Sequence, residues 1–494
     1  MKMKYRKLLL WIVGFFILVL AGILLVERKL ENELRASLGD RAEISVVDIS
    51  LILNRMELRK LNLELDEVQM EVDVINLSGF KVLSWLFHDK IQVKSLEVSQ
   101  AHISYIGGKS DTTAGSAFNY VIGIDEFSIL DSQVRVMDQD AESLSAQVPR
   151  LVVEGVELDQ ESFRSPIPFR YDRYYLQVDS LMTELDPRHD LFLNQLTSDN
   201  GDVLAKDLRV IPRYDRETFQ NHIDHELDRY DLTVAAIKMD RLGIDFVGDT
   251  LRISNPVLRI EEADLEVYRD KLQPDDPSKK LLYSAQIRNL PFFMEVDTME
   301  VVESHIVYLE RVHEDREPLQ VIFSEVDGTV LNLINHSQDE EPEDTRISVK
   351  ARFMEAAPLL VDWRFNVADP LERFTISGNF KGLPSEGVNR FLTPAMNISA
   401  TGGISYLAFN FHGNDDLATG EMRLEYQDFS VEVLKKDGTQ KRGLLTAIAN
   451  IFVSSKAQGE DTELTDLEVT RDKSKSFWNF LWLCLKEGAL ESFL

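Results

Sequence analysis

Cysteine is almost absent from this 494-residue chain, and basic residues are too few to balance the acidic ones. Cys484 is the only cysteine, so no intrachain disulfide and no thiolate metal cluster can form. The 54 Lys and Arg residues stand against 84 Asp and Glu residues, a formal net charge of -30. Nucleic-acid binding depends on basic side chains that neutralise phosphates, and the same negative charge repels anionic headgroups. The composition therefore argues against nucleic acid as a partner and predicts that any contact with lipid is apolar.

Motifs of catalysis and cofactor binding are also missing from the sequence. It has no Gly-rich loop with the spacing of a P-loop or a dinucleotide site, and no Gly-x-Ser-x-Gly elbow. The most enzyme-like fragment runs from His222 to Glu226, but its order His-x-x-His-Glu differs from that of zinc peptidase helices. We interpret it as part of an exposed amphipathic helix around residues 215–227. No catalytic residue, metal or cofactor is predicted.

Only one hydrophobic run is long enough to cross a membrane. The uncharged run from Leu8 to Val26 would span about 28 Å as a helix, close to the thickness of a bilayer core. The basic residues before it are Lys2, Lys4, Arg6 and Lys7, which predict a cytoplasmic N-terminus. The alternative is a cleaved signal peptide, but its apolar region would be shorter, and Val26-Glu-Arg-Lys is a poor cleavage site. We expect residues 1–27 to form a cytoplasmic tip and an uncleaved anchor.

Beyond this run the sequence reads mostly as β-strands, and many of them share one break in their alternation. In residues 96–105 the apolar positions alternate up to Val98 and resume at Ala101, three residues later instead of two. The same ten-place pattern fits residues 56–65 and 237–246, with near matches that begin at residues 127, 176, 251 and 299. A β-bulge would restore the original face after such a step and would bend the strand. The pattern predicts a curved antiparallel β-sheet with one apolar and one polar face.

The apolar face of such a sheet needs a cover. Other strands can supply it, as in a sandwich or barrel, or the face stays partly open as a groove that holds lipid or a partner. On the groove interpretation the lining residues are Leu96, Val98, Ile103, Tyr105, Leu251, Ile253, Leu258, Ile260, Met299, Val301, Ile306 and Tyr308. Polar loops at residues 107–119, 273–280 and 337–346 are too short for flexible linkers, so one β-rich domain is expected over residues 28–440.

The last part of the chain changes from strands to helices. Strands are predicted over residues 346–434, with a hairpin turn at residues 413–416 between the last two. Turn geometry explains the acidic pairs Asp275-Asp276 and Asp415-Asp416. The C-terminal region, residues 441–494, has helical spacing at 442–453 and a bulkier apolar stretch at 474–485. That stretch either plugs the end of the sheet or contacts a membrane or a partner through Phe477, Trp478, Phe480, Leu481 and Trp482.

Three features of the sequence together carry a family resemblance. The first is the order of a basic N-terminus, one span and strands such as KIQVKSLEVSQAHISYI. The second is residues 210–246, and the third is residues 387–434 with the helical tail. In these features the chain resembles the AsmA-like family of bacterial envelope proteins. The resemblance implies an inner-membrane anchor and an elongated β-groove in the periplasm, and larger relatives are thought to conduct phospholipid towards the outer membrane.

Three functions remain open at this point. The leading hypothesis is a single-pass protein of the bacterial inner membrane that binds or transfers phospholipid in an apolar β-groove and supports outer-membrane biogenesis. The alternative is an envelope assembly or scaffold protein without lipid cargo, whose acidic face binds another envelope protein. The third, an enzyme, has no visible set of catalytic residues, and zinc bound through His222 and His225 would revive it.

Overall fold

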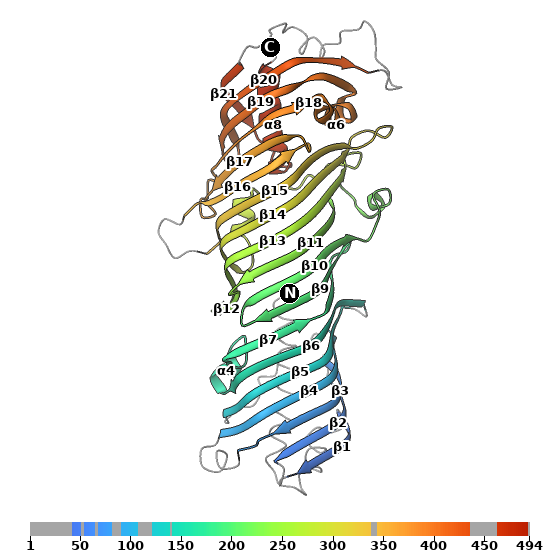
Figure 1. The fold of residues 1–494 in the computed structure, drawn as a ribbon, viewed down its shortest axis with the longest axis vertical. Coiled ribbons are helices and arrows are strands. Elements are labelled where there is room, and N and C mark those ends of the chain that lie inside the picture. The colour runs from blue at the N-terminus through green and yellow to red at the C-terminus, as the bar shows by residue number, and fades with distance from the viewer. Residues whose placement is uncertain are drawn as a thin grey trace. The chain divides into compact units, whose positions relative to one another are not determined.

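The computed structural model describes residues 42–50, 54–64, 68–81, 90–106, 121–138, 141–336, 343–434 and 462–492. The chain divides into two compact units, Met1–Asp207 (unit 1) and Leu208–Leu494 (unit 2). Both units consist mainly of β-strands, which form a curved sheet in each (Figure 1). The predicted membrane anchor lies outside the described residues. Within them, no helix has both the length and the hydropathy that a membrane crossing needs.

Unit 1 is built from strands that mostly follow one another across the sheet. Its elements are β1 (Ala42–Ser50), β2 (Arg55–Glu64), β3 (Val68–Ser78), β4 (Lys90–Ile106), β5 (Val121–Asp138), β6 (Ala141–Leu158), the short helix α4 (Gln160–Arg164), β7 (Arg173–Val178), β8 (Ser180–Asp186) and β9 (His189–Asp199). Strands β1 to β6 pair in order, β7 and β8 share the far side of β6, and both pair with β9. Strand β10 (Asp202–Pro212) contains the division between the units.

Unit 2 has a longer run of strands and, within the described residues, most of the helices. Its strands are β11 (Arg229–Asp240), β12 (Gly243–Val247), β13 (Thr250–Asp270), β14 (Phe293–Arg311), β15 (Leu319–Ile334), β16 (Thr345–Phe353), β17 (Ala357–Phe365), β18 (Phe374–Pro384), β19 (Ile398–Gly413), β20 (Leu417–Val433) and β21 (Thr462–Thr470). Its helices are η2 (Phe219–His222), α5 (Tyr283–Arg288), α6 (Ser385–Met396) and α8 (Phe477–Ser492). Strands β11 and β12 pair with one side of β13, and β13 to β21 then pair in order.

The sheets are mixed, so the prediction of a purely antiparallel sheet is wrong at two places. Strands β4 and β5 are parallel, and so are β13 and β14. A hairpin cannot join parallel neighbours, because the chain must return to the starting end of the first strand. Residues 271–292 make that return in unit 2 and carry α5. The pattern of apolar residues did not reveal the parallel pairs, since alternation is the same in strands of either direction.

The predicted break in alternation is present in several strands. Buried positions on β4 step from Val98 to Ala101, and the residue between them at the break, Gln100, has a left-handed backbone with φ 54°. Lys60 on β2, Asp131 on β5 and Glu303 on β14 are left-handed at the equivalent place of the pattern. The matches that begin at residues 176 and 251 carry no left-handed residue there, so they do not contain this conformation.

Across β2 to β5 the break differs from a β-bulge, because neighbouring strands share it, whereas β14 and β15 shift register at the break, between Val301 and Ser304, as a bulge does. Arg59 pairs with Val74 and Leu61 with Val72, so Lys60 faces a single partner residue across the ladder. The same continuity holds from β3 to β4 and from β4 to β5 on this row. An ordinary bulge would place two residues against one and shift the register. Here each strand changes phase on the same row, and all keep their apolar side chains on one face.

In both units a buried serine forms hydrogen bonds with the backbone where the strands change phase. In unit 1, Ser132 accepts a hydrogen bond from the Ala101 backbone N–H at 3.0 Å and donates to the Leu130 carbonyl at 2.8 Å. In unit 2, Ser304 accepts from the Ala263 N–H at 3.1 Å and donates to the Val302 carbonyl at 3.2 Å. The hydroxyl thus satisfies a backbone donor that the altered pleat leaves without a carbonyl partner.

We expect Ser132→Ala to destabilise unit 1 by about 1–3 kcal/mol, because the buried Ala101 N–H then lacks an acceptor. Hydrogen exchange at Ala101 and the urea midpoint of the full chain would measure this loss. Ser128→Ala is the matched control, since this serine is buried in the same strand and its hydroxyl has no hydrogen bond to a described residue. Equal effects of the two substitutions would contradict the role of the Ser132 hydroxyl.

The helix predictions have mixed outcomes. The predicted helix at residues 215–227 is wrong, since this segment contains only the single turn η2, anchored by the fully buried Phe219. The ring of His222 stacks on Tyr214 at 3.5 Å. The helix predicted at 474–485 is confirmed as α8, and the hairpin turn is confirmed between Gly413 and Leu417. The helix predicted at 442–453 lies outside the described residues.

Candidate functional site: the apolar face of unit 2

Unit 2 has a continuous apolar face that crosses many strands. Directly paired residues on neighbouring strands point to the same side of a sheet, so the registers define rows of side chains. One row consists of Met239, Leu258, Met299, Val330, Ile347 and Trp363. The next consists of Ile237, Ile260, Val301, Gly328, Val349 and Val361. We call this surface the apolar face.

The predicted groove residues of unit 2 are half-buried. This holds for Leu251, Ile253, Leu258, Ile260, Met299, Val301, Ile306 and Tyr308. Leu251 and Ile253 pair with Phe246 and Ile244 of β12. The other six lie on rows of the apolar face, since the left-handed residues Glu262 and Glu303 give β13 and β14 the same change of phase. Side chains on the central strands therefore remain partly accessible to an apolar molecule.

The predicted groove residues of unit 1 are sealed instead. Leu96, Val98, Ile103 and Tyr105 have only 0–3% of their surface exposed. They belong to one hydrophobic core with buried residues of β2, β3, β5 and β6. The sequence could not separate the two sets, because both follow the same pattern of alternation.

Helix α8 covers the apolar face at the C-terminal end of unit 2. Its inner side chains Phe477, Phe480 and Cys484 are buried. Phe477 stacks on Trp363 of the apolar face at 4.4 Å with an interplanar angle of 5°. Of the five residues predicted to contact a membrane or partner, Phe477 and Phe480 thus pack against the sheet, and Leu481 is half-buried. Trp478 is 55% exposed and Trp482 is 39% exposed.

Helix α5 joins α8 over the same end of the sheet. Tyr283 of α5 lies edge-on to Trp363 at 5.5 Å and accepts a hydrogen bond from the Trp478 indole N–H at 2.9 Å. Arg288, at the end of α5, donates to the Val367 carbonyl at 2.6 Å and contacts Glu372, which also contacts Ser284. We call α5, residues 471–476 and α8 the C-terminal cap.

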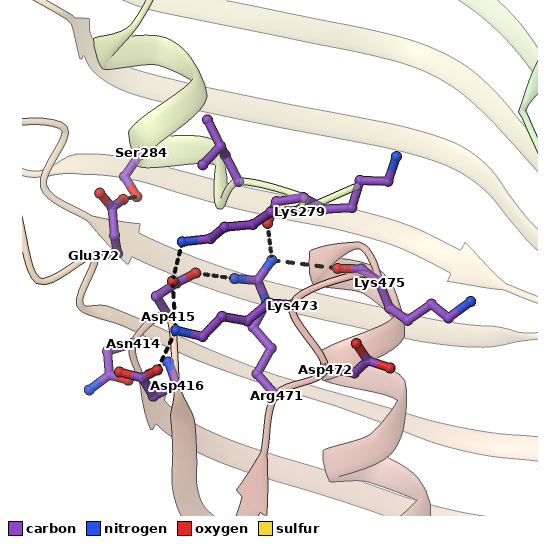
Figure 2. A network of polar contacts seen from close by, with 12 residues as sticks. Lys279, Ser284, Glu372, Asn414, Asp415, Asp416, Arg471, Asp472, Lys473 and Lys475 are labelled. Carbon is purple, nitrogen blue, oxygen red and sulfur yellow. Dashed lines mark hydrogen bonds and ion pairs between the residues drawn. The ribbon is translucent and has the colours of Figure 1, made fainter. Parts of the chain in front are cut away.

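An ionic network fastens the cap to the turn between β19 and β20. Figure 2 shows Lys279, Arg471 and Lys473 around the carboxylate of Asp415. The Lys279 and Lys473 ammonium groups lie 2.9 and 3.1 Å from Asp415 Oδ2, and Arg471 contacts Oδ1. Arg471 also donates to the Lys280 carbonyl at 2.6 Å, and its side chain is 0% exposed. Three segments far apart in the sequence thereby meet at Asp415.

A second set of ion pairs continues this network towards β11. Lys475 lies 3.2 Å from Glu226 and 2.6 Å from Asp275, and Lys271 also contacts Glu226. The Glu226 side chain is almost fully buried, so its charge requires these partners. The start of α8 is therefore tied both to the turn of Asp415 and to the segment that carries α5.

The lysines also fix the charge state of Asp415. Burial alone raises the pKa of this carboxyl, but hydrogen bonds from Lys279 and Lys473 outweigh it and hold the pKa below the usual aspartate value. Burial lowers the pKa of Arg471, but an arginine side chain stays protonated in proteins. Asp415 and Arg471 are therefore both charged at neutral pH. The sequence placed Asp415 in a turn but did not show that its carboxylate holds the cap.

Other candidate sites are weak. Two polar hollows of about 200 Å³ lie in unit 1, one beside Lys60 and His102 and one beside Arg173 and Tyr174. No group of three or more metal-ligating side chains occurs within the described residues. The chain matches no protein-family model and no curated protein sequence, so the family resemblance stays a prediction.

Proposed function

We propose that unit 2 binds the hydrocarbon chains of lipid on its apolar face. The observation that carries this proposal is the half-buried state of the rows through Leu258 and Ile260, next to an end of the same face that the C-terminal cap covers. Hydrocarbon placed on these rows would cover the apolar surface that neighbouring side chains leave exposed to water. The net charge of -30 disfavours anionic surfaces and leaves apolar contact as the main attraction.

The mechanism of binding is passive. Each methylene group that leaves water contributes about 0.8 kcal/mol, so a few buried methylenes outweigh the loss of a lipid's mobility. Headgroups lie outside the apolar face, at its polar border. No catalytic step, metal or cofactor enters this proposal.

The family resemblance gives this binding a cellular setting. We propose that the run from Leu8 to Val26 anchors the chain in a bacterial inner membrane, with the N-terminus in the cytoplasm and the β-rich part in the periplasm. Phospholipid is then the nearest source of hydrocarbon, and its binding or transfer would support outer-membrane biogenesis.

Charging the apolar face is expected to abolish lipid binding. The double variant Leu258→Asp/Met299→Asp should lose at least nine-tenths of its bound lipid, because two carboxylates on paired positions of one row cannot be buried against hydrocarbon. The measurement is mass spectrometry of the lipid that co-purifies with the full chain, per mole of protein. Leu360→Asp is the matched control, since Leu360 is exposed on the opposite face of β17. Full lipid loading in the double variant would refute the proposal.

A second candidate is a scaffold protein without lipid cargo, and the sealed core of unit 1 favours it. A closed core is what a protein that presents only its outer surface requires. On this function the full chain would carry a stable protein partner in mild detergent and no stoichiometric lipid. The same purification therefore separates the two candidates.

A further inference from the structure

Charged and aromatic side chains border the apolar face at one end of β11, β13 and β14. The last apolar row there contains Tyr230, Val267 and Tyr308, which pair in register. The next positions in the same phase are Asp228, Arg269 and Glu310, and Arg269 pairs with Glu310. We call Asp228, Tyr230, Arg269, Tyr308 and Glu310 the tyrosine rim.

Hydrogen bonds within the tyrosine rim join its donors to its two carboxylates. Arg269 holds both oxygens of Asp228, through Nε at 2.6 Å and Nη2 at 2.7 Å. The Tyr230 hydroxyl donates to Asp228 Oδ2 at 3.2 Å, and the Tyr308 hydroxyl donates to Glu310 Oε2 at 2.5 Å. Burial and the neighbouring Glu310 raise the pKa of Tyr308, so its hydroxyl keeps its proton. Both tyrosines use their only donor on a carboxylate, and a phenolic oxygen can also accept a hydrogen bond.

The tyrosine rim is therefore rich in acceptors and negatively charged. Two carboxylates and one guanidinium leave a net charge of -1. Glu310 Oε1 has no hydrogen-bond partner within the described residues. An anion would meet two carboxylates here, while the Arg269 guanidinium is already engaged by Asp228.

Two aromatic side chains, Tyr230 and Tyr308, lie beside the carboxylates of the tyrosine rim. Tyr230 is 42% exposed. Tyr283 of α5 is hydrogen-bonded to the exposed Trp478 in the C-terminal cap. Aromatic faces beside carboxylates are the surroundings that bind organic ammonium ions in proteins.

We propose that the tyrosine rim binds the primary ammonium headgroup of a lipid whose chains lie on the apolar face. This inference rests on the proposed lipid binding and adds the class of headgroup. The ammonium group donates to Glu310 Oε1 and to the tyrosine oxygens and contacts the ring faces. Tyr308, Ile306 and Val301 all lie on β14. One lipid can therefore place its headgroup at the row of Tyr308 and its chains on the half-buried rows.

The test is competition between two lipids that differ only at the amine. The full chain is incubated with vesicles that contain equal amounts of phosphatidylethanolamine and its N-acetylated derivative, and bound lipid is identified by mass spectrometry. We expect about fivefold preference for the free amine, from cation–aromatic and carboxylate contacts at a partly exposed site. Glu310→Gln should reduce it to near equality. Tyr230→Phe, a conservative change at an exposed side chain, should reduce it by about half.

Glu300→Gln is the matched control, because it changes net charge equally but lies on the opposite face, paired with Arg259 at 2.6 Å. It should keep the preference, which excludes repulsion by the whole protein as the cause. Equal loading of both lipids by the unaltered chain, or the same preference in both glutamine variants, would overturn the headgroup site while lipid binding stands. Absence of any bound lipid would overturn the proposed function and this inference together.

Discussion

Asp415→Ala is expected to destabilise the C-terminal cap by about 3–5 kcal/mol, because it leaves the buried Arg471 guanidinium without its carboxylate. The Arg471 side chain is 0% exposed, so water cannot replace the lost partner. Hydrogen exchange in α8 should accelerate by about two orders of magnitude or more. Arg471→Met, in contrast, leaves Asp415 still paired with Lys279 and Lys473 and should cost less. The double variant Asp415→Ala/Arg471→Met should recover much of the loss.

The neighbouring Asp416 gives the control in the same turn. Its side chain is 74% exposed and contacts only Lys473 among the described residues, so Asp416→Ala should cost about 0–1 kcal/mol. Equal effects at Asp415 and Asp416 would show that the network does not hold the cap. Because the folded pKa of Asp415 is lowered, its contribution is complete at neutral pH. It should be lost as the pH falls below the usual aspartate range, about 4, through the lower folded pKa.

Phe477→Ala is expected to cost about 3–5 kcal/mol, because it removes a buried ring from the underside of α8. The ring stacks on Trp363 and meets Phe374 edge-on at 5.3 Å, so neighbouring side chains cannot fill the space without moving. Cys484 supplies the measurement, since it is the only thiol in the chain and lies buried on the same side of α8. Burial raises its pKa to about 12, so it should react with thiol reagents only when α8 opens.

Trp478→Ala tests the exposed side of the same helix. It removes one hydrogen bond to Tyr283 from a side chain that is more than half exposed, so we expect a cost of about 1 kcal/mol. Labelling of Cys484 should then be much slower than in Phe477→Ala. Equally fast labelling in the two variants would mean that α8 is held by its outer face and does not plug the sheet.

Local patterns in the sequence predicted the strands and the change of phase. Alternation is a property of each strand alone, so the pattern of residues 96–105 correctly located the left-handed Gln100 and its equivalent Lys60. What a single strand cannot reveal is whether its neighbours change phase on the same row. The predicted β-bulge is therefore wrong across β2 to β5, where the register is continuous, and agrees with the register shift between β14 and β15.

The relative direction of paired strands and the burial of their apolar face could not be predicted from the sequence for a related reason. Parallel and antiparallel strands alternate alike, so nothing marked β4 with β5 or β13 with β14 as parallel pairs. Leu96 and Leu258 have the same pattern around them, yet one is sealed in a core and the other is half-buried. The difference comes from packing between distant segments.

The ionic contacts were missed because their partners are far apart in the chain. Arg471 and Lys280 are separated by 191 positions, and Lys279 and Asp415 by 136. One sequence signal could have drawn attention to the tyrosine rim. Arg269 and Glu310 are charged residues at positions where the strand alternation calls for an apolar side chain, and such a position usually requires a charged partner.

The row on which strands β2 to β5 change phase also limits how this chain can change length. If Gln100 were deleted, β4 would alternate regularly and keep its apolar side, but everything after the deletion would sit one position out of step with both β3 and β5. The register would match again only if each adjoining strand also lost its residue on this row. This row therefore fixes the register of the neighbouring strands. At this row the sheet should tolerate a substitution but not a deletion.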